Sequence, residues 1–123
     1  MIKITLVGGS GYLGSHLCDL LFERRYRVTI FDKKKSKYLN KSHKFIEGDT
    51  LDKNKLFKAI KGADYVFNFA GAANMDDLKN DPIKTVKSNI LGTVNVLEAS
   101  CRFKVKKFIH ASTIYANTEE GGF

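Results

Sequence analysis

The stretch "VGGSGYLGSHL" at residues 7–17 most constrains the fold of this chain. Gly9, Gly11 and Gly14 fit the pattern G-x-G-x-x-G, and Gly8 with the last two fits G-x-x-G-x-x-G. The apolar run "KITLV" precedes these glycines, and leucines at helical spacing follow them. Because glycine has no side chain, the backbone can turn tightly there. A pyrophosphate can then lie against the N–H groups of the helix. The stretch therefore predicts a dinucleotide site between a strand and a helix.

Five apolar runs have the length of a strand and predict a sheet. They are "KITLV", "RVTIF", "KFIEG", "DYVFNFA" and "KKFIHAS". Most are nearly continuous rather than alternating, as strands covered on both faces are. We therefore expect a parallel sheet with helices on both sides.

Three helices are expected between these runs. The first covers residues 11–25, with its leucines on one apolar face. The second covers residues 51–62, with Asp49 or Asp52 as its cap. The third starts at the cap Asp81 with Pro82 in its first turn. Its apolar residues recur every three or four positions, as in a helix; they are Ile83, Val86, Ile90, Val94 and Leu97.

The order of these elements predicts the fold class. Crossovers between parallel strands are right-handed, and with the glycine loop after the first strand they favour the strand order 3-2-1-4-5. The expectation is an α/β fold of the Rossmann type, a doubly wound parallel sheet truncated after the fifth strand. The length of 123 residues suits one domain, residues 1–123.

Composition excludes several classes of protein. No apolar run is long enough for a membrane span, and the start "MIKITLVGG" enters a strand without a signal peptide, so we expect a cytoplasmic protein with no membrane partner. Cys18 and Cys101 are interpreted as small buried hydrophobic residues, and no metal site is expected. The net charge of +8 raises nucleic acid as a partner, but the lysines are scattered. A solvated lysine-rich surface is therefore favoured over a nucleic-acid-binding domain.

The residues that follow the second strand bear on the cofactor. Asp32 lies 18 residues past Gly14, where a carboxylate that accepts hydrogen bonds from a ribose is expected. Such a carboxylate repels a 2'-phosphate, which favours NAD over NADP. The three residues after it, Lys33, Lys34 and Lys35, could offset that repulsion.

Three other loops contain candidate site residues with two interpretations each. Asp49 could accept from an adenine amino group or cap the next helix. Small residues at 70–73 could admit a flat ligand or form a tight turn. Ser112 and Thr113 leave the fifth strand, where hydroxyls serve either catalysis or ordinary turn formation.

Taken together, these stretches resemble a known family. The matching pieces are the glycines at 8, 11 and 14, "GDTLD" at 48–52, "NFAGAAN" at 68–74, "NILGTVNVLEA" at 89–99 and "FIHAST" at 108–113. In this order they resemble the cofactor-binding half of the extended short-chain dehydrogenase/reductase family. Its NAD-dependent epimerases and dehydratases act mainly on nucleotide sugars.

The resemblance implies roles for individual residues. It places the glycine loop at the pyrophosphate, Asp32 at the adenosine ribose, and Asp49 with Thr50 at the adenine. It places Phe69 to Gly71 on the path to the nicotinamide ribose, and Asn89 near the nicotinamide. The cofactor-binding residues that it implies are Gly8, Gly11, Tyr12, Leu13, Gly14, Asp32, Lys33, Asp49, Thr50, Phe69, Ala70, Gly71 and Asn89. Thr113 matches the catalytic Ser/Thr, with Ser112 as the alternative.

The chain departs from the family pattern in three places. Val7 replaces the threonine often found before the first glycine. The loop after Thr113 lacks the Asp-Glu pair of the sugar 4,6-dehydratases. No tyrosine stands four residues before a lysine, although the family transfers its proton through such a pair.

These departures leave three hypotheses. The first is a fragment of an NAD-dependent oxidoreductase for a nucleotide-sugar-like substrate, inactive alone, whose Tyr and Lys lie downstream. The second is a non-catalytic NAD(P)-binding module, and the third a nucleic-acid-binding domain. In a fragment, the fifth strand would have an unpaired edge, so we also expect self-association into a homo-oligomer through that edge.

Overall fold

The structure, a computed structural model, describes residues 1–39, 43–72 and 75–113. Its five strands form one parallel sheet in the order β3-β2-β1-β4-β5, as predicted. The strands are β1 (Lys3–Val7), β2 (Arg27–Asp32), β3 (Lys44–Glu47), β4 (Tyr65–Asn68) and β5 (Lys107–His110). The helices are α1 (Tyr12–Glu23), α2 (Lys53–Ile60), α3 (Met75–Asn80), α4 (Pro82–Val86), the π-helix η1 (Lys87–Leu91) and α5 (Gly92–Arg102).

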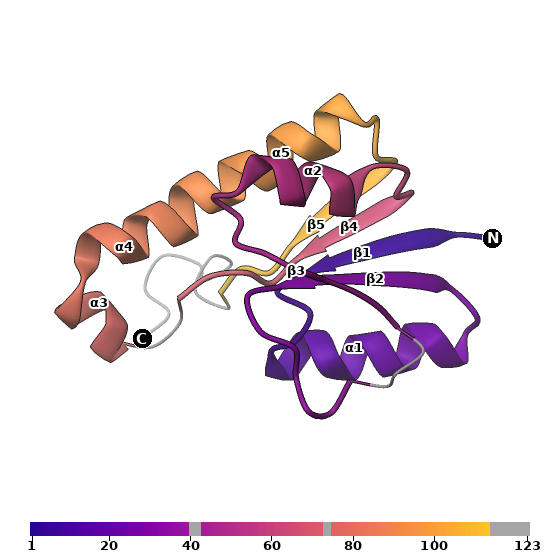
Figure 1. Ribbon diagram of the computed structural model, residues 1–123, viewed down its shortest axis with the longest axis horizontal. Helices are drawn as coiled ribbons and strands as arrows, with labels where there is room; N and C mark the ends of the chain where they lie inside the picture. The colour runs from indigo at the N-terminus through magenta and orange to yellow at the C-terminus, as the bar shows by residue number, and fades with distance from the viewer. Residues whose placement is uncertain (40–42, 73–74, 114–123) are drawn as a thin grey trace, which may run out of the picture.

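Helices lie on both faces of the sheet (Figure 1). α1 lies on one face, and α2 with α5 lies on the other. Under α1 the core contains strand side chains such as Leu6 and Ile30 with Cys18. Under α2 and α5 it contains Phe31 with Leu56 and other fully buried residues. These two apolar layers confirm the prediction of a doubly wound fold from continuous apolar strands.

Side-chain caps define where two helices begin. Asp52 accepts a hydrogen bond from Lys55 N at 3.1 Å and caps α2. Asp81 accepts from Lys84 N at 2.9 Å, with Pro82 at the first position of α4. Asp49 is not the cap of α2, so the helix-cap interpretation of that residue was wrong.

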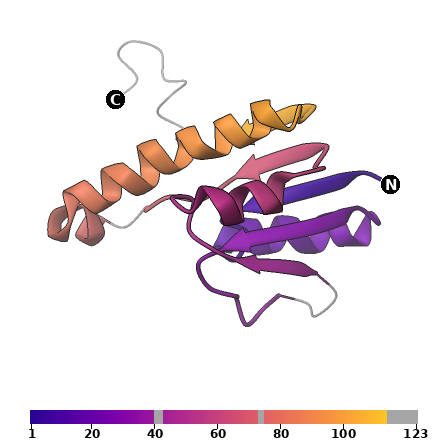
Figure 2. The ribbon, with the colours of Figure 1, turned by 45° about the horizontal axis from the view of Figure 1, so that its top comes forward.

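The third predicted helix exposes its apolar stripe. The run from α4 through η1 to α5 forms one nearly straight rod across the sheet (Figure 2). Its apolar stripe faces away from the sheet; Ile83 is 69% exposed and Ile90 61% exposed. Small and polar residues of α5 face inward instead, among them Gly92 and Asn95. The periodicity correctly identified helical structure here, but periodicity identifies an apolar face and not what covers it.

Three smaller features concern the cysteines, His110 and the length of the helices. Cys18 is buried, as predicted, but Cys101 is exposed. His110 at the end of β5 is exposed, and its Nδ1 lies 3.3 Å from Asn68 Nδ2. In the described part of the chain no helix is long and apolar enough to cross a membrane.

Candidate functional site

A cavity of about 720 Å³ lies where the strands end, on the carboxyl side of the sheet. This is the edge at which ligands bind in open parallel sheets. The predicted site residues that line it are Gly8, Gly11, Asp32, Lys33, Thr50, Phe69, Ala70 and Gly71. Unpredicted lining residues include Ser10, Ser36, Lys84, Thr85 and Ser88. The strand ends thus bring together residues that lie far apart in the sequence, from Val7 to Ser88.

The glycine loop passes so close to its neighbours that side chains would not fit. Gly8 has a φ of +78°, and a Cβ there would lie 2.5 Å from Ala70 N. A Cβ at Gly14 would lie 2.7 Å from Gly8 O. Gly8 N donates to Phe31 O at 2.8 Å, which fixes the loop to β2. Both glycines are therefore required by the backbone's path.

The first turn of α1 presents its N–H groups without a side-chain cap. Gly11 is the N-cap and offers no side-chain acceptor, and no acidic residue stands in the first turn. The Tyr12 and Leu13 side chains are exposed and lie outside the lining of the cavity. Only their backbone N–H groups are candidates for contact with an anion, which the helix dipole also favours.

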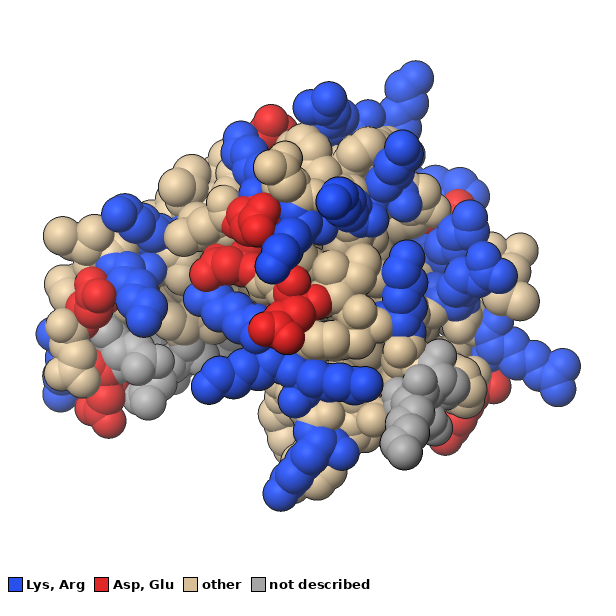
Figure 3. All heavy atoms as spheres, viewed as in Figure 1, with Lys and Arg blue, Asp and Glu red and all other residues tan. Residues whose placement is uncertain are grey.

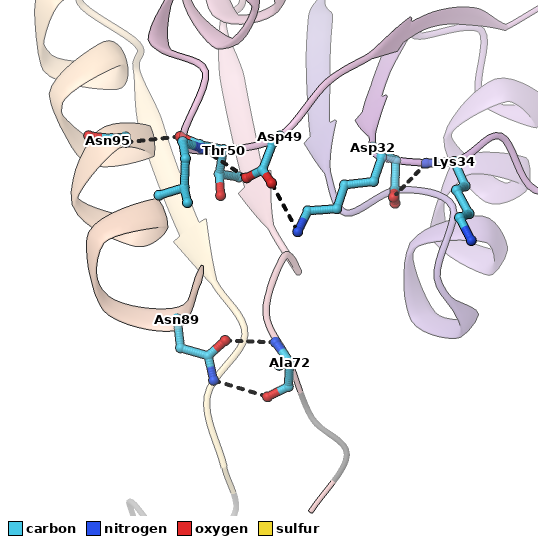
Figure 4. A network of polar contacts seen from close by, with 9 residues as sticks. Asp32, Lys34, Asp49, Thr50, Ala72, Asn89 and Asn95 are labelled. Carbon is cyan, nitrogen blue, oxygen red and sulfur yellow. Dashed lines mark hydrogen bonds and ion pairs between the residues drawn. The ribbon is translucent and has the colours of Figure 1, made fainter. Parts of the chain in front are cut away.

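Asp32 ends β2 with its carboxylate already oriented. Its Oδ2 accepts from Ser10 N at 3.0 Å. Its Oδ1 accepts from Lys34 N at 3.4 Å (Figure 4). Ser36 N donates to Ser10 Oγ at 3.3 Å, so the loop after β2 is fastened to the glycine loop. Each carboxylate oxygen has a second lone pair, which leaves room for the two hydroxyls of a diol.

Asp49 follows β3 and pairs with Lys33, which lines the cavity, whereas Asp49 and Gly14 are outside the lining. Lys33 Nζ lies 3.0 Å from Asp49 Oδ2, and Leu51 N donates to Asp49 Oδ1 at 3.0 Å. Burial alone would raise the pKa of Asp49. The Leu51 hydrogen bond and the Lys33 ammonium outweigh it and hold that pKa below its usual range. Asp49 is therefore an ionised acceptor, and Lys33 is its partner.

Thr50 is buried between the cavity and α5. Its carbonyl accepts from Asn95 Nδ2 at 2.9 Å (Figure 4). A Cβ added at Gly92 would overlap Thr50 Oγ1, so the Thr50 side chain fits here only because residue 92 is a glycine. Thr50 consequently connects the β3 end of the cavity to the helix behind it.

The loop after β4 is held by two asparagines. Asn68 is 1% exposed, and its Oδ1 accepts from Ala70 N at 3.2 Å. The amide of Asn89 exchanges two hydrogen bonds with the backbone of Ala72 (Figure 4). Asn89 lies on η1 and outside the cavity lining, so in this structure it positions the loop. Asn68 was not predicted, although a polar residue inside "YVFNFA" was its signal.

Ser112 and Thr113 lie after β5 and are exposed. Neither lines the cavity. The loop that follows them, which contains Tyr115 and lacks the Asp-Glu pair, lies outside the described residues. The catalytic roles of Ser112 and Thr113 therefore remain predictions. Among the residues that the structure does describe, no group of three or more His, Cys, Asp or Glu is placed to hold a metal ion.

The sequence of this chain is similar to those of known proteins. Residues 4–122 match the model of the NAD dependent epimerase/dehydratase family. The chain is 31% identical to a UDP-glucose 4-epimerase of Yersinia enterocolitica, over 96% of this chain and 39% of that protein. It is 37% identical to a UDP-N-acetyl-alpha-D-glucosaminuronate decarboxylase of Bacillus cytotoxicus, over 90% of this chain and 36% of that protein.

A solved structure has the same fold. The UDP-glucose 4-epimerase of Thermus thermophilus, in complex with NAD, superimposes with a TM-score of 0.86 at 30% identity. The match covers 98% of this chain and 41% of that one. This chain thus spans less than half the length of the relatives it matches. With a family match over nearly all of its residues, the chain belongs to the NAD dependent epimerase/dehydratase family.

Proposed function

We propose that this chain is the NAD-binding part of an oxidoreductase that acts at a sugar carbon of a nucleotide-sugar-like substrate. The reaction would be an epimerisation, a dehydration or a reduction. The observation that carries the proposal is the cavity at the strand ends, lined by the glycine loop, Asp32 and the small residues after β4. When bound there, the cofactor would accept a hydride and return it in an epimerisation or dehydration, or donate one as NADH in a reduction.

The cavity residues fit a dinucleotide by their chemistry. The glycine loop offers close backbone approach, and the uncapped first turn of α1 offers N–H groups to a pyrophosphate. Asp32 would accept hydrogen bonds from the hydroxyls of the adenosine ribose, and Asp49 would accept from the adenine amino group. The loop from Phe69 to Gly71 would border the nicotinamide ribose, with Asn89 holding that loop in place.

The charges around Asp32 support NAD rather than NADP. A 2'-phosphate would meet the Asp32 carboxylate, which two backbone N–H groups fix in position. Lys33 is paired with Asp49 at 3.0 Å, so its charge is already partly offset. Lys34 and Lys35 also line the cavity and would attract the same phosphate. We infer that the fixed carboxylate dominates, because it lies at the end of β2 while long lysine side chains lose entropy on ordering.

The catalytic part of the proposal concerns a longer protein. Thr113 would hydrogen-bond the substrate hydroxyl, but no Tyr-x-x-x-Lys pair occurs in these 123 residues. The relatives named above are about two and a half times as long, and their names specify UDP-sugar substrates. We therefore infer that hydride transfer requires residues beyond this chain.

Calorimetric titration with NAD and NADP tests the cofactor assignment. The parent chain is expected to bind NAD more tightly than NADP. In Asp32→Ala, NAD binding should weaken and the preference over NADP should shrink, because the fixed carboxylate is gone. Glu23→Ala removes the same charge at the exposed end of α1 and should leave both affinities unchanged. Equal binding of NAD by the parent and Asp32→Ala would contradict the assignment.

A non-catalytic NAD-binding module is the second candidate. The absence of the Tyr-x-x-x-Lys pair from the sequence favours it. The two candidates differ in turnover: a protein extended through any downstream coding sequence should interconvert UDP-sugars if the enzyme proposal is correct. If the extended protein binds NAD without changing any UDP-sugar, the module is the better description.

A further inference from the structure

Three neighbouring strands each begin with a basic residue, at the end of the sheet opposite the cavity. Lys3 on β1 is the register partner of Arg27 on β2. Lys44 on β3 is the register partner of Thr29 on β2. Alternate residues of a strand share a face. Lys3 therefore shares its face with Val7, which packs in the core under α2 and α5. The three cations thus lie on the face that α2 covers.

α2 adds two more cations to the same place. The helix packs on the strands, and Thr5 Oγ1 donates to the carbonyl of Ala59 near its end at 2.9 Å. Lys58 stands in the last turn of α2, and Lys61 follows the final residue of the helix. Because α2 ends there, it leaves a hollow of about 240 Å³ over the strand starts. Five cations line this hollow, which we call the basal pocket: Lys3, Arg27, Lys44, Lys58 and Lys61.

No acidic residue is among the described residues that line this basal pocket. The carboxylate of Asp64, just before β4, accepts from Lys3 N at 2.9 Å, pairs with Lys106 at 2.9 Å and also attracts the Lys3 ammonium. The other Lys–carboxylate pairs of the described chain involve Lys33 and Lys53, both outside the pocket. Figure 3 shows Lys and Arg gathered toward the end of this face that contains the N-terminus of Figure 1. Among the described residues, four of the five pocket cations, Arg27, Lys44, Lys58 and Lys61, therefore have no ion pair with a carboxylate.

Five like charges around one hollow repel one another, and a bound anion relieves that repulsion. The volume is below the range of about 300–1,000 Å³ of pockets for drug-sized ligands, so the pocket suits a small group. Arg27 supplies a planar fork of donors, lysines supply point charges, and Thr29 adds a hydroxyl, a set that matches the oxygens of phosphate.

We propose that the basal pocket binds a compact anion with two or more phosphate groups, of which inorganic pyrophosphate is the simplest example. This site lies at the amino ends of β1, β2 and β3, whereas the proposed cofactor cavity lies at their carboxyl ends. The two sites share no lining residue. The proposal is therefore independent of whether the chain binds NAD.

NMR titration of the 123-residue chain with inorganic pyrophosphate at low ionic strength tests the proposal. Saturable shifts are expected at the amides of Gly62 and Ala63, which line the pocket. Lys58→Glu/Lys61→Glu should weaken this binding at least about tenfold, since it removes two charged contacts. The milder Lys58→Gln/Lys61→Gln, which leaves the chain without new acids, should weaken it in the same direction.

A matched control separates the site from general charge. Lys87→Glu/Lys107→Glu makes the same change in net charge outside the pocket and should retain the affinity of the parent for pyrophosphate. An equal loss in this control would overturn the proposal. Shifts confined to the glycine loop, at Gly11, would also overturn it. So would single-stranded RNA that binds in a salt-dependent way and is not displaced by pyrophosphate, since the basic surface would then serve nucleic acid.

Discussion

The carboxamide of Asn89 holds the backbone of Ala72 on both sides. Ala72 N donates to Asn89 Oδ1 at 2.6 Å, and Asn89 Nδ2 donates to Ala72 O at 3.0 Å (Figure 4). This side chain on η1 thereby makes the pair of backbone hydrogen bonds that a neighbouring strand would make with the loop after β4. Because this loop borders the cavity through Ala70 and Gly71, the position of one helix residue determines the shape of one cavity wall.

Asn89→Asp should weaken this connection. A carboxylate can still accept from Ala72 N, but it cannot donate to Ala72 O and places a negative charge beside that carbonyl. We expect a loss of about 1 kcal/mol in the free energy of unfolding, measured by urea denaturation. NAD affinity should fall severalfold as the loop loses its position. Asn54→Asp on α2 is the matched control, and unchanged NAD binding in Asn89→Asp would contradict a positioning role.

Gly92→Ala should destabilise the chain although alanine favours helices. The new Cβ would overlap Thr50 Oγ1, and Thr50 is buried and held by Asn95 at 2.9 Å. Overpacking of this kind costs about 1–3 kcal/mol in the free energy of unfolding, more than alanine's helix propensity returns. Urea denaturation measures the change. Adding Thr50→Ala to Gly92→Ala should recover part of the stability; a Gly92→Ala chain as stable as the parent would rule out the overlap.

The two cysteines should differ in reactivity. Burial, with a smaller contribution from the charge of Asp19, raises the pKa of the Cys18 thiol to about 12. Cys101 is exposed on α5. Since the thiolate is the reactive form, iodoacetamide at pH 8 should modify Cys101 in the native chain and Cys18 only after unfolding. Mass spectrometry of peptides measures both, and Cys101→Ser should show no rapid labelling. Rapid native modification of Cys18 would mean that its side of the core opens.

Much of the fold could be predicted from the sequence because it depends on local patterns and chain handedness. Continuous apolar runs identified the five strands, and right-handed crossovers gave their order. The caps Asp52 and Asp81 could be identified because a capping side chain bonds only three residues away. The direction of the apolar stripe on α4 and α5 could not, because small residues such as Gly92 allow a close approach to the sheet from the other side.

The candidate site was predictable where backbone geometry demands a residue type and less so where side chains meet across loops. Gly8 and Gly14 stand out because a Cβ would collide with backbone. The contacts of Asn89 with Ala72, and of Lys33 with Asp49, join positions 16 or 17 residues apart. No periodicity encodes such pairs, since they depend on how the strand ends come together in the folded chain.

Stability should fall in acid partly through Asp64. Its hydrogen bond and ion pair with Lys106, and its hydrogen bond from Lys3 N, hold the pKa of Asp64 below its usual range. A folded-state pKa below the unfolded value gives stability that is present above the ordinary aspartate pKa and is lost as pH falls through the lowered one. Asp64→Asn should therefore lose less stability between pH 6 and pH 3 than the parent. Urea denaturation at both values measures this, and an undiminished drop would assign the acid sensitivity to other carboxylates such as Asp49.

Self-association should depend on surfaces that lie away from the cavity. β5 is the last strand of the described sheet and pairs with β4 on one side. The stripe on α4, η1 and α5 adds exposed apolar area, including Ile90 and Val94 at 61% and 51% exposure. Unpaired strand edges and large apolar patches both favour association. Sedimentation at increasing concentration should therefore show species larger than the monomer.

Two variants distinguish the surfaces that cause this association. Ile90→Lys/Val94→Lys places charge on the helical stripe, where both side chains are exposed, and should leave the fold unchanged. If the stripe mediates association, this variant should sediment as a monomer at concentrations where the parent does not. If association persists in full, the edge of β5 is the contact, as its outer position in the described sheet predicts. Phe108→Pro, which introduces a proline into that strand, should then reduce association. A parent chain that remains monomeric at the highest concentration would contradict association through either surface. It would show that the β5 edge and the apolar stripe can remain exposed to water.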